Sequence, residues 1–416
     1  MEFKRQFYLD ELIRKQHNGF VKVVTGLRRC GKSYLLRTIF KKYLLEHGLS
    51  PEQIVEMAFD ERDNKRFRDP DVFYEFAKGK IEQHPDSIFL LDEIQLLEDF
   101  ESVLNGLLGH NAEIYATGSN AKFLSKDIIT EFRGRGDKVH MTPLTFAELF
   151  AEFHDDRDKR FHDYMLYGGL PLVALADLPE DKISILNSLY TETYLRDITG
   201  RNKIRKTADL ENLLDILSSN IGCLVNPDKL EKMFHSVKKS KITSDTITKY
   251  ISYLEDAYLL EEARRYDVKG NAYLKSPMKY YYSDLGLRNA RLKFRQVEET
   301  HSMENIIYNE LRHRKFNVDI GQVSVNEKNA SGTYSRKQLE VDFVANKGSK
   351  RYYIQSAYMI PDEEKREQEI RSLLKIGDSF KKIVITSHAP APLYDDHGIL
   401  TMSIYDFLLN PDSLEY

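Results

Sequence analysis

The stretch Gly26-Leu27-Arg28-Arg29-Cys30-Gly31-Lys32-Ser33 matches the phosphate-binding loop (P-loop) pattern at both glycines and at the closing Lys-Ser pair. Glycines at these two places let backbone N–H groups surround a polyphosphate without obstruction by side chains. Lys32 is placed to reach the β- and γ-phosphate oxygens, and the hydroxyl of Ser33 is placed to bind Mg²⁺. The pattern predicts a nucleotide site with contacts from Gly26, Arg29, Cys30, Gly31, Lys32, Ser33 and Tyr34.

The segments on either side of this loop fit the same kind of site. Residues 20–24 are apolar apart from Lys22 and rich in β-branched side chains, which predicts a short buried strand. From Ser33 to about Leu45, apolar and aromatic residues recur at helical spacing. A strand, a glycine-rich loop and a helix form the context that a P-loop needs, and the helix would aim its positive N-terminal end at the phosphates. A chance glycine-rich turn is the weaker interpretation.

A second part of the site is predicted further along the chain. Ser87-Ile88-Phe89-Leu90-Leu91-Asp92-Glu93 is an apolar run that ends in two carboxylates, as expected of a central strand in a parallel sheet. Asp92 is placed to hold Mg²⁺ through its water shell, and Glu93 to polarise the attacking water. The alternative is an ordinary buried strand whose acids begin a loop. In combination with the P-loop, the two acids favour a hydrolytic nucleotide site in which Lys32, Asp92 and Glu93 are catalytic.

The whole chain has 416 residues and a formal net charge of −4. This length predicts two to four domains, and this charge gives no overall signature of a polyanion-binding protein. The two cysteines, Cys30 and Cys223, argue against a disulfide framework and suit a reducing cytosol. The sequence contains no run of eighteen apolar residues and no signal-peptide core. We therefore expect a cytoplasmic protein without a membrane partner.

Alternating strands and helices predict one α/β domain with a parallel sheet over residues 1–150. Further strands of this domain are expected over 54–59 and 113–117. Its further helices are expected over 71–83 and 98–109.

Polar and basic residues follow the last of these strands. A residue that senses the γ-phosphate is expected there, and Ser119, Thr117 and Asn120 are candidates in that order; the alternative is a turn that caps the next helix. Further on, Arg133 and Arg135 stand in a glycine-containing loop that could place a guanidinium on the γ-phosphate, in cis or from a neighbouring subunit of a homo-oligomer. Arg135 is the preferred candidate, and a solvated basic loop is the alternative for both.

The middle of the chain predicts a helical lid or linker over 151–204 and a winged-helix-like domain over 205–290. Helices of the latter are expected over 208–220, 227–235 and 243–254, the last in the place of a recognition helix. From Arg201 to Tyr250, ten lysines and arginines stand against six acids, a local charge of +4 by subtraction. That charge suits phosphate contacts with DNA, whereas many such domains only join protein partners, and both alternatives stay open.

The last segment, 291–416, predicts a C-terminal α/β domain of the restriction-endonuclease-like type. Two expected strands, 339–345 and 351–357, would form the frame of a metal site, with Asp342 on the first. Such a site also needs a carboxylate and a lysine on the second strand, where this chain has Gln355 and Ala357. A neutral amide is a poor Mg²⁺ ligand and alanine carries no charge, so we expect Asp342 to mark a weak second site in a domain that is inactive as a nuclease.

These motifs resemble those of a widespread family of bacterial and archaeal AAA-type ATPases of unassigned role, related to the archaeal-ATPase and STAND-like P-loop proteins. The resemblance covers nearly the whole chain. It implies an ATP-binding core, a winged-helix segment and a C-terminal domain of unknown function with a nuclease-like fold. Lys32, Ser33, Asp92 and Glu93 match the ATPase site of the family without departure, while Gln355 and Ala357 depart from its active nuclease pattern. The resemblance rests on Thr25 to Ser33, Leu91-Asp92-Glu93-Ile94-Gln95, Thr117-Gly118-Ser119, Gly134-Arg135, Pro143 to Leu149, Tyr167-Gly168-Gly169-Leu170-Pro171 and Glu340-Val341-Asp342-Phe343.

We therefore expect an ATP- and Mg²⁺-binding P-loop ATPase that hydrolyses ATP slowly and works as a nucleotide-dependent switch for its other domains. One alternative is a DNA-binding regulator whose affinity ATP controls. A less favoured one is a metal-dependent nuclease that combines Asp342 with acids near Glu304 or Glu310. The sequence does not name the protein partner, and the P-loop alone does not exclude GTP.

Overall fold

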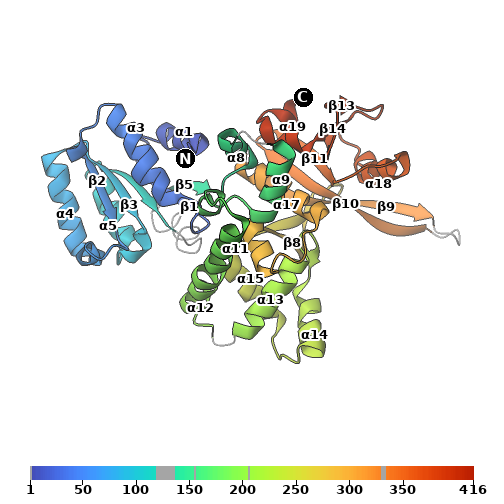
Figure 1. The fold of residues 1–416 in the computed structure, drawn as a ribbon, viewed down its shortest axis with the longest axis horizontal. Coiled ribbons are helices and arrows are strands. Elements are labelled where there is room, and N and C mark those ends of the chain that lie inside the picture. The colour runs from blue at the N-terminus through green and yellow to red at the C-terminus, as the bar shows by residue number, and fades with distance from the viewer. Residues whose placement is uncertain (1, 119–135, 154–155, 205–206, 329–333) are drawn as a thin grey trace. The chain divides into compact units, whose positions relative to one another are not determined.

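The structure, a computed structural model, describes residues 2–118, 136–153, 156–204, 207–328 and 334–416. The chain packs as two units, which are coloured along the chain in Figure 1. The N-terminal unit comprises residues 1–144 with the short segments 170–172 and 255–259, and the C-terminal unit comprises 145–169, 173–254 and 260–416. This grouping into two units does not test the predicted division into four domains, which stays a prediction.

A five-stranded sheet in the order β2-β3-β4-β1-β5 forms the centre of the N-terminal unit. Every neighbouring pair in it is parallel, so all carboxyl ends meet at one edge. This confirms the predicted α/β class with a parallel sheet. Its strands are β1 (Val21–Gly26), β2 (Ile54–Ala58), β3 (Ile88–Asp92), β4 (Glu113–Thr117) and β5 (Gly136–Met141).

The helix α4 of this unit begins where the sequence supplies clear helix-starting signals. Asp69 accepts hydrogen bonds from the backbone N–H groups of Asp71 and Val72, and Pro70 takes the first helical position of α4. After the P-loop, three consecutive stretches, one of them a π-helix, form continuous helix from Lys32 to Glu46. The helices are α1 (Gln6–Arg14), α2 (Lys32–Tyr34), η1 (Leu35–Phe40), α3 (Lys41–Glu46), η2 (Pro51–Gln53), η3 (Lys65–Arg68), α4 (Pro70–Gln83), η4 (Ile94–Leu96) and α5 (Phe100–Leu108).

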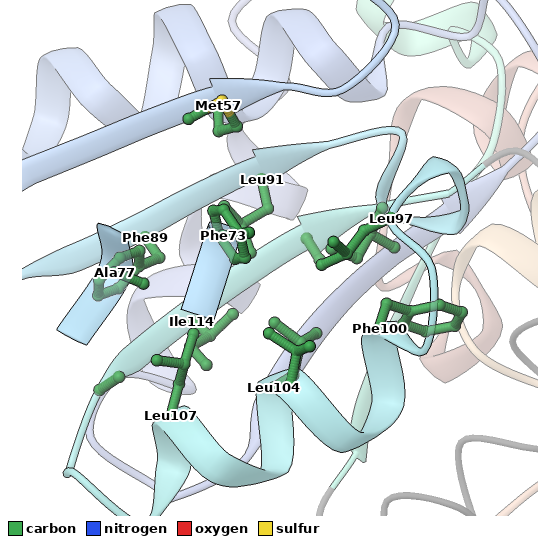
Figure 2. Close-up of a cluster of buried hydrophobic side chains, with 14 of the residues drawn as sticks. Met57, Phe73, Ala77, Phe89, Leu91, Leu97, Phe100, Leu104, Leu107 and Ile114 are labelled. Carbon is green, nitrogen blue, oxygen red and sulfur yellow. The ribbon is translucent and has the colours of Figure 1, made fainter. Parts of the chain in front are cut away.

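The core of the N-terminal unit fills the space between the sheet and the helices α4 and α5. Alternate strand residues point to this face, as the two-residue period of a strand requires. Figure 2 shows Phe89 and Leu91 of β3 directed toward Phe73 of α4, with Leu104 of α5 on the same side. This packing fixes β3, and with it the acids at its carboxyl end.

A nine-stranded sheet in the order β13-β14-β12-β11-β10-β9-β7-β8-β6 runs through the C-terminal unit. Its pairs are antiparallel except for β11–β12, β12–β14 and β7–β9, which are parallel. The strands are β6 (Leu224–Val225), β7 (Leu260–Asp267), β8 (Ala272–Tyr282), β9 (Asn317–Lys328), β10 (Tyr334–Lys347), β11 (Lys350–Ala357), β12 (Lys381–Thr386), β13 (Leu393–Tyr394) and β14 (Ile399–Ser403).

Helices surround this larger sheet. On one face, Ile370 and Leu373 of α18 join a core with residues of β9, β10, β11 and β12. The helix α17 packs against β8, β9, β10 and β11. The helices that follow β5 are α8 (Phe146–Phe153), α9 (Arg157–Tyr167), α10 (Pro171–Ala174), α11 (Pro179–Ser188), η5 (Leu189–Leu195), α12 (Arg196–Arg201), α13 (Thr207–Ser219), α14 (Pro227–Val237), α15 (Ser244–Asp256), α16 (Leu285–Arg291), α17 (Glu299–His313), α18 (Glu363–Leu374), α19 (Ile404–Leu409) and η6 (Ser413–Glu415).

The segment predicted to be a winged helix has a feature that the sequence did not reveal. The expected helices are present as α13, α14 and α15, and the hairpin β7–β8 follows them, with β6 paired to β8. The outer edge of β7, however, pairs in parallel with β9, from Arg265 opposite Ile320 to Asp267 opposite Gln322. The hairpin is therefore an interior part of the large sheet, and the winged-helix assignment stays a prediction.

Candidate nucleotide site

The loop between β1 and α2 has the backbone conformation that its glycines permit. Gly26 has φ 140° and Gly31 has φ 105°, and Arg29 between them is left-handed at φ 68°. A Cβ atom on Gly26 would stand 2.0 Å from the carbonyl oxygen of Met141 in the neighbouring strand β5. Glycine is thus required at position 26 by the close approach of β5, as well as by the open loop expected from the sequence.

Lys32 follows this loop directly, and its side chain is buried against it. Its ammonium donates hydrogen bonds to the carbonyl oxygens of Gly26 at 3.1 Å and of Leu27 at 3.0 Å. Both partners are neutral carbonyls of the loop itself. The ammonium charge is therefore held at the loop, where the oxygens of a phosphate could take the place of these carbonyls.

Ser33 and Asp92 lie together at the carboxyl edge of the sheet. The hydroxyl of Ser33 donates to Oδ1 of Asp92 at 2.9 Å. Asp92 is only 4% exposed, and this burial raises its pKa above the ordinary value even though hydrogen bonds from Thr117 and Ser33 act in the opposite direction. A hydroxyl and a carboxylate are hard oxygen ligands, so this pair fits Mg²⁺ with its remaining positions left to water and phosphate.

Thr117, the last residue of β4, connects the two acids of the site. Its fully buried hydroxyl donates to Oδ1 of Asp92 and accepts the backbone N–H of Glu93 at 3.0 Å. Because β4 is the neighbour of both β3 and β1, this side chain reaches the acids from the adjacent strand. Of the three sensor candidates, Thr117 is the one that the described residues place at the acids.

Glu93 directly follows β3 and adopts a left-handed conformation, with φ 52° and ψ 49°. Such a conformation is uncommon for a residue with a side chain, and it turns the chain sharply at the edge of the sheet. One carboxylate oxygen of Glu93 accepts a hydrogen bond from the side-chain amide of Gln95. The carboxylate of Glu93 is thus held by a neighbour that the sequence reasoning did not select.

Gln95 could have been found from one sequence signal. It is the only polar residue among the four that follow the two acids, Ile94, Gln95, Leu96 and Leu97. A polar side chain in an otherwise apolar turn next to a proposed catalytic acid needs a polar partner, and here that partner is Glu93.

The other predicted nucleotide contacts stay predictions. Cys30 is fully buried, and its thiol donates to the carbonyl oxygen of Met141 at 3.5 Å, whereas Arg29 is exposed. Tyr34 is 45% exposed, and its hydroxyl donates to Glu2. The predicted residues Ser119, Asn120, Arg133 and Arg135 lie outside the described residues.

A second charged cluster lies in the C-terminal unit, around the predicted weak site at Asp342. The buried Glu304 of α17 accepts a hydrogen bond from Lys279 of β8 at 2.9 Å and another from the hydroxyl of Tyr281 at 2.6 Å. Lys279 also forms an ion pair with Glu340 at 2.7 Å. Asp342 accepts the backbone N–H of Ser356 at 2.8 Å. Glu310, the other acid considered for this site, pairs with Arg314 instead.

The electrostatics of this cluster centre on Lys279. Burial alone would lower the pKa of Lys279, but Glu304 and Glu340 outweigh it, so its pKa is raised. For Glu304, burial acts to raise the pKa and Lys279 outweighs it, so the pKa is lowered. Burial, with Glu304 nearby, raises the pKa of Asp342 well above its ordinary value. The positive charge among these acids is therefore supplied by the side chain of Lys279.

Across the described ranges, no three His, Cys, Asp or Glu side chains converge closely enough to hold a metal ion on their own. The P-loop site does not need such a set, because Mg²⁺ in these sites takes most of its ligands from water and phosphate. The nuclease alternative does need one. No helix in the described part of the chain is long and apolar enough to cross a membrane.

Two family models match the sequence. One described as an AAA domain matches residues 18–150, and one described as a domain of unknown function matches residues 158–298. An uncharacterised protein of Haemophilus influenzae is 34% identical over 412 residues, which cover 97% of this chain and 98% of the relative. An uncharacterised protein of Methanocaldococcus jannaschii is 27% identical over 412 residues, which cover 93% of this chain and 85% of the relative.

Solved structures give a weaker likeness. The Orc1 protein of Aeropyrum pernix, in complex with DNA, aligns at 14% identity and a TM-score of 0.28 over 70% of this chain and 93% of that one. Cdc6p from Pyrobaculum aerophilum aligns at 11% identity and a TM-score of 0.28 over 70% of this chain and 92% of that one. These TM-scores are too low to support an argument about the fold. The fold class therefore rests on the strand order and on the family models.

Proposed function

This chain belongs to a family of P-loop AAA-type ATPases of unknown role, together with the Haemophilus influenzae protein, and on that premise we propose that it hydrolyses ATP slowly with Mg²⁺ and acts as a nucleotide-dependent switch. The observation that carries the proposal is the continuous hydrogen-bonded series from Ser33 through Asp92 and Thr117 to Glu93. It brings a metal-binding pair and a candidate base to the same edge of the sheet as the P-loop lysine.

Each residue has a role that follows from its chemistry. Mg²⁺, when bound, supplies positive charge that offsets the charge of the phosphate oxygens. Ser33 and Asp92 would hold it, and Lys32 would donate to phosphate oxygens in place of the carbonyls of Gly26 and Leu27. Glu93 would accept a hydrogen bond from the attacking water and so orient it.

The switch part of the proposal is supported by the position of Thr117. Thr117 is the residue at which β4 ends, and the next backbone N–H, that of Gly118, donates to Val24 of β1 at 3.1 Å. A change in the hydrogen bonding of Asp92 on nucleotide binding would therefore reach the point at which the chain leaves the sheet. Slow turnover belongs to the same proposal, since a switch must keep ATP bound long enough for its other domains to respond.

The test is nucleotide binding and phosphate release with ATP and with GTP, in Mg²⁺ and in EDTA. The Lys32→Ala variant is expected to lose nucleotide binding. Lys41→Ala is the matched control, because Lys41 belongs to the same continuous helix but pairs with Glu56 at the surface. Tight ATP binding by Lys32→Ala would contradict the assignment of the site.

Glu93→Gln separates binding from hydrolysis. This variant is expected to bind ATP as the wild type does and to release no phosphate above background, because the amide does not accept a proton from water. Turnover that survives the change would show that another residue positions the water.

A second candidate function is DNA binding controlled by ATP. It is favoured by Lys238, Lys239 and Lys241, which are exposed in the turn before α15. The interior position of the β7–β8 hairpin counts against insertion of a wing into a groove. The test is DNA affinity across a salt series. If each lysine neutralises one phosphate, the slope of log affinity on log salt should become shallower by about 0.9 for each lysine replaced by alanine. The absence of any binding at low salt would remove this candidate.

A further inference from the structure

The turn that carries Glu93 and Gln95 is held in place from several directions. Ile94 and Leu97 are buried in the hydrophobic core beside β3. The backbone N–H of Leu96 donates to the carbonyl oxygen of Glu93 at 3.0 Å, which closes the short helix η4. With the N–H of Glu93 bound to Thr117, the turn has little freedom, and the side chains of Glu93 and Gln95 are therefore presented in fixed directions.

The contact between Glu93 and Gln95 fixes the orientation of the Gln95 side-chain amide. An ionised carboxylate only accepts hydrogen bonds, so the amide nitrogen of Gln95 must face it, as the structure has it. The amide oxygen is then directed elsewhere. That oxygen, Oε1, is buried, and within the described part of the chain it has no hydrogen-bond partner. A buried acceptor without a partner is costly, so the site favours a ligand that donates a hydrogen bond to it.

The chemistry of the site limits what this donor can be. Phosphate oxygens and carboxylates offer acceptors, and Mg²⁺ would bind at the Ser33–Asp92 pair. Water is the reactant that carries protons to donate. A water molecule that donates one hydrogen bond to Glu93 and the other to Gln95 keeps a lone pair free for the phosphorus atom. This is the orientation that in-line attack requires.

We propose that Gln95 is a second water-orienting residue of the ATPase site, with its amide nitrogen on the carboxylate of Glu93 and its amide oxygen on the attacking water. In the reaction the water oxygen forms a bond to the γ-phosphorus, the bond to the bridging oxygen of ADP breaks, and the water proton passes to Glu93. This inference rests on the proposed ATPase function and adds a residue to it.

The experiment compares nucleotide affinity with kcat for the full chain and its variants. Gln95→Ala is expected to lower kcat by about tenfold or more, with Kd and KM for ATP within about twofold of the wild type. Gln83→Ala is the matched control, because Gln83 is exposed at the end of α4.

Gln95→Glu gives a readout that a purely structural role would not move. A neutral carboxylic acid has one donor and one acceptor, as the amide does, whereas its ionised form repels Glu93. The kcat of Gln95→Glu relative to that of the wild type at the same pH is therefore expected to rise as the pH falls.

The outcomes separate the two levels of the proposal. A wild type that neither binds nor hydrolyses ATP would overturn the proposed function and the role of Gln95 with it. Wild-type turnover with an unchanged kcat in Gln95→Ala would overturn the role of Gln95 alone. If Gln95→Ala proves unfolded by its melting temperature, a flat pH dependence of Gln95→Glu still decides against the inference.

Discussion

The hydroxyl oxygen of Thr117 accepts the backbone N–H of Glu93 at 3.0 Å, so a strand-end side chain fixes the residue that would orient water. The same hydroxyl donates its proton to Asp92. One side chain thereby sets the positions of both acids, which belong to the neighbouring strand β3 and to the turn after it.

Replacing Thr117 by Val should remove both hydrogen bonds while keeping the shape of the side chain. The change leaves the N–H of Glu93 without its acceptor, and we expect a decrease of about 1–3 kcal/mol in the free energy of unfolding. Phosphate release should fall as well. Thr117→Ser keeps the hydroxyl and is the control, measured by urea unfolding and by turnover. Equal stability and turnover of the Val and Ser variants would contradict this role of Thr117.

Asp92 should make the stability of the nucleotide-free protein depend on pH. Burial raises the pKa of Asp92 in the folded state, so the folded protein takes up this proton more readily than the unfolded chain. The ionised carboxylate therefore costs stability above the raised pKa, and that cost disappears as the pH falls through it. Asp92→Asn should accordingly stabilise the nucleotide-free protein at pH 7.5, and stabilise it by less at pH 5. The same gain in urea unfolding at both pH values would disprove the raised pKa.

Gly26→Ala should destabilise the N-terminal unit even without nucleotide. The new methyl group would meet the carbonyl oxygen of Met141 at 2.0 Å in a backbone conformation that only glycine adopts readily. We expect a decrease of at least about 2 kcal/mol in the free energy of unfolding. Gly79→Ala is the matched control, since Gly79 lies inside α4 with nothing within 4 Å of an added Cβ, and alanine should stabilise there by about 0.5–1 kcal/mol. Equal melting temperatures for Gly26→Ala and Gly79→Ala would refute this account of Gly26.

Lys279→Met should leave Glu304 as a buried charge without its main partner. The expected cost is about 3–5 kcal/mol of unfolding free energy. Adding Glu304→Gln removes that charge, so the double variant should be more stable than the sum of the two single effects predicts. A double-mutant cycle by urea unfolding measures this coupling. Strict additivity would show that Lys279 and Glu304 do not stabilise one another.

Much of the candidate nucleotide site could be predicted from the sequence, because each position of its motifs is explained by local chemistry. The P-loop lysine and serine, and the two acids that end β3, can be identified from spacing and from apolar context alone. The second reason for glycine at position 26 cannot be identified this way, because it comes from Met141, on a strand that is distant in sequence. The sequence ranks Ser119 before Thr117 as the sensor candidate, and it does not reveal the hydrogen bonds by which the hydroxyl of Thr117 joins Asp92 and Glu93.

The C-terminal unit shows a different limit of sequence reasoning. The departure at Gln355 and Ala357 predicts that a metal site there would lack ligands. The lysine that lies among the acids could not be found, because Lys279, Glu304 and Glu340 come from three separate elements, β8, α17 and β10. Similarly, the parallel pairing of β7 with β9 could not be predicted, since a strand carries no local mark of which neighbour its edge will meet.

That pairing has a consequence for how the protein is made. During synthesis, β7 and β8 leave the ribosome well before Asn317–Lys328, the strand that covers the outer edge of β7. Until then the nascent hairpin exposes unpaired backbone groups, and the unit must wait for distant residues before its sheet is complete. The C-terminal unit is therefore expected to fold only once β9 has been made, and a shorter fragment that ends before β9 would be prone to aggregate.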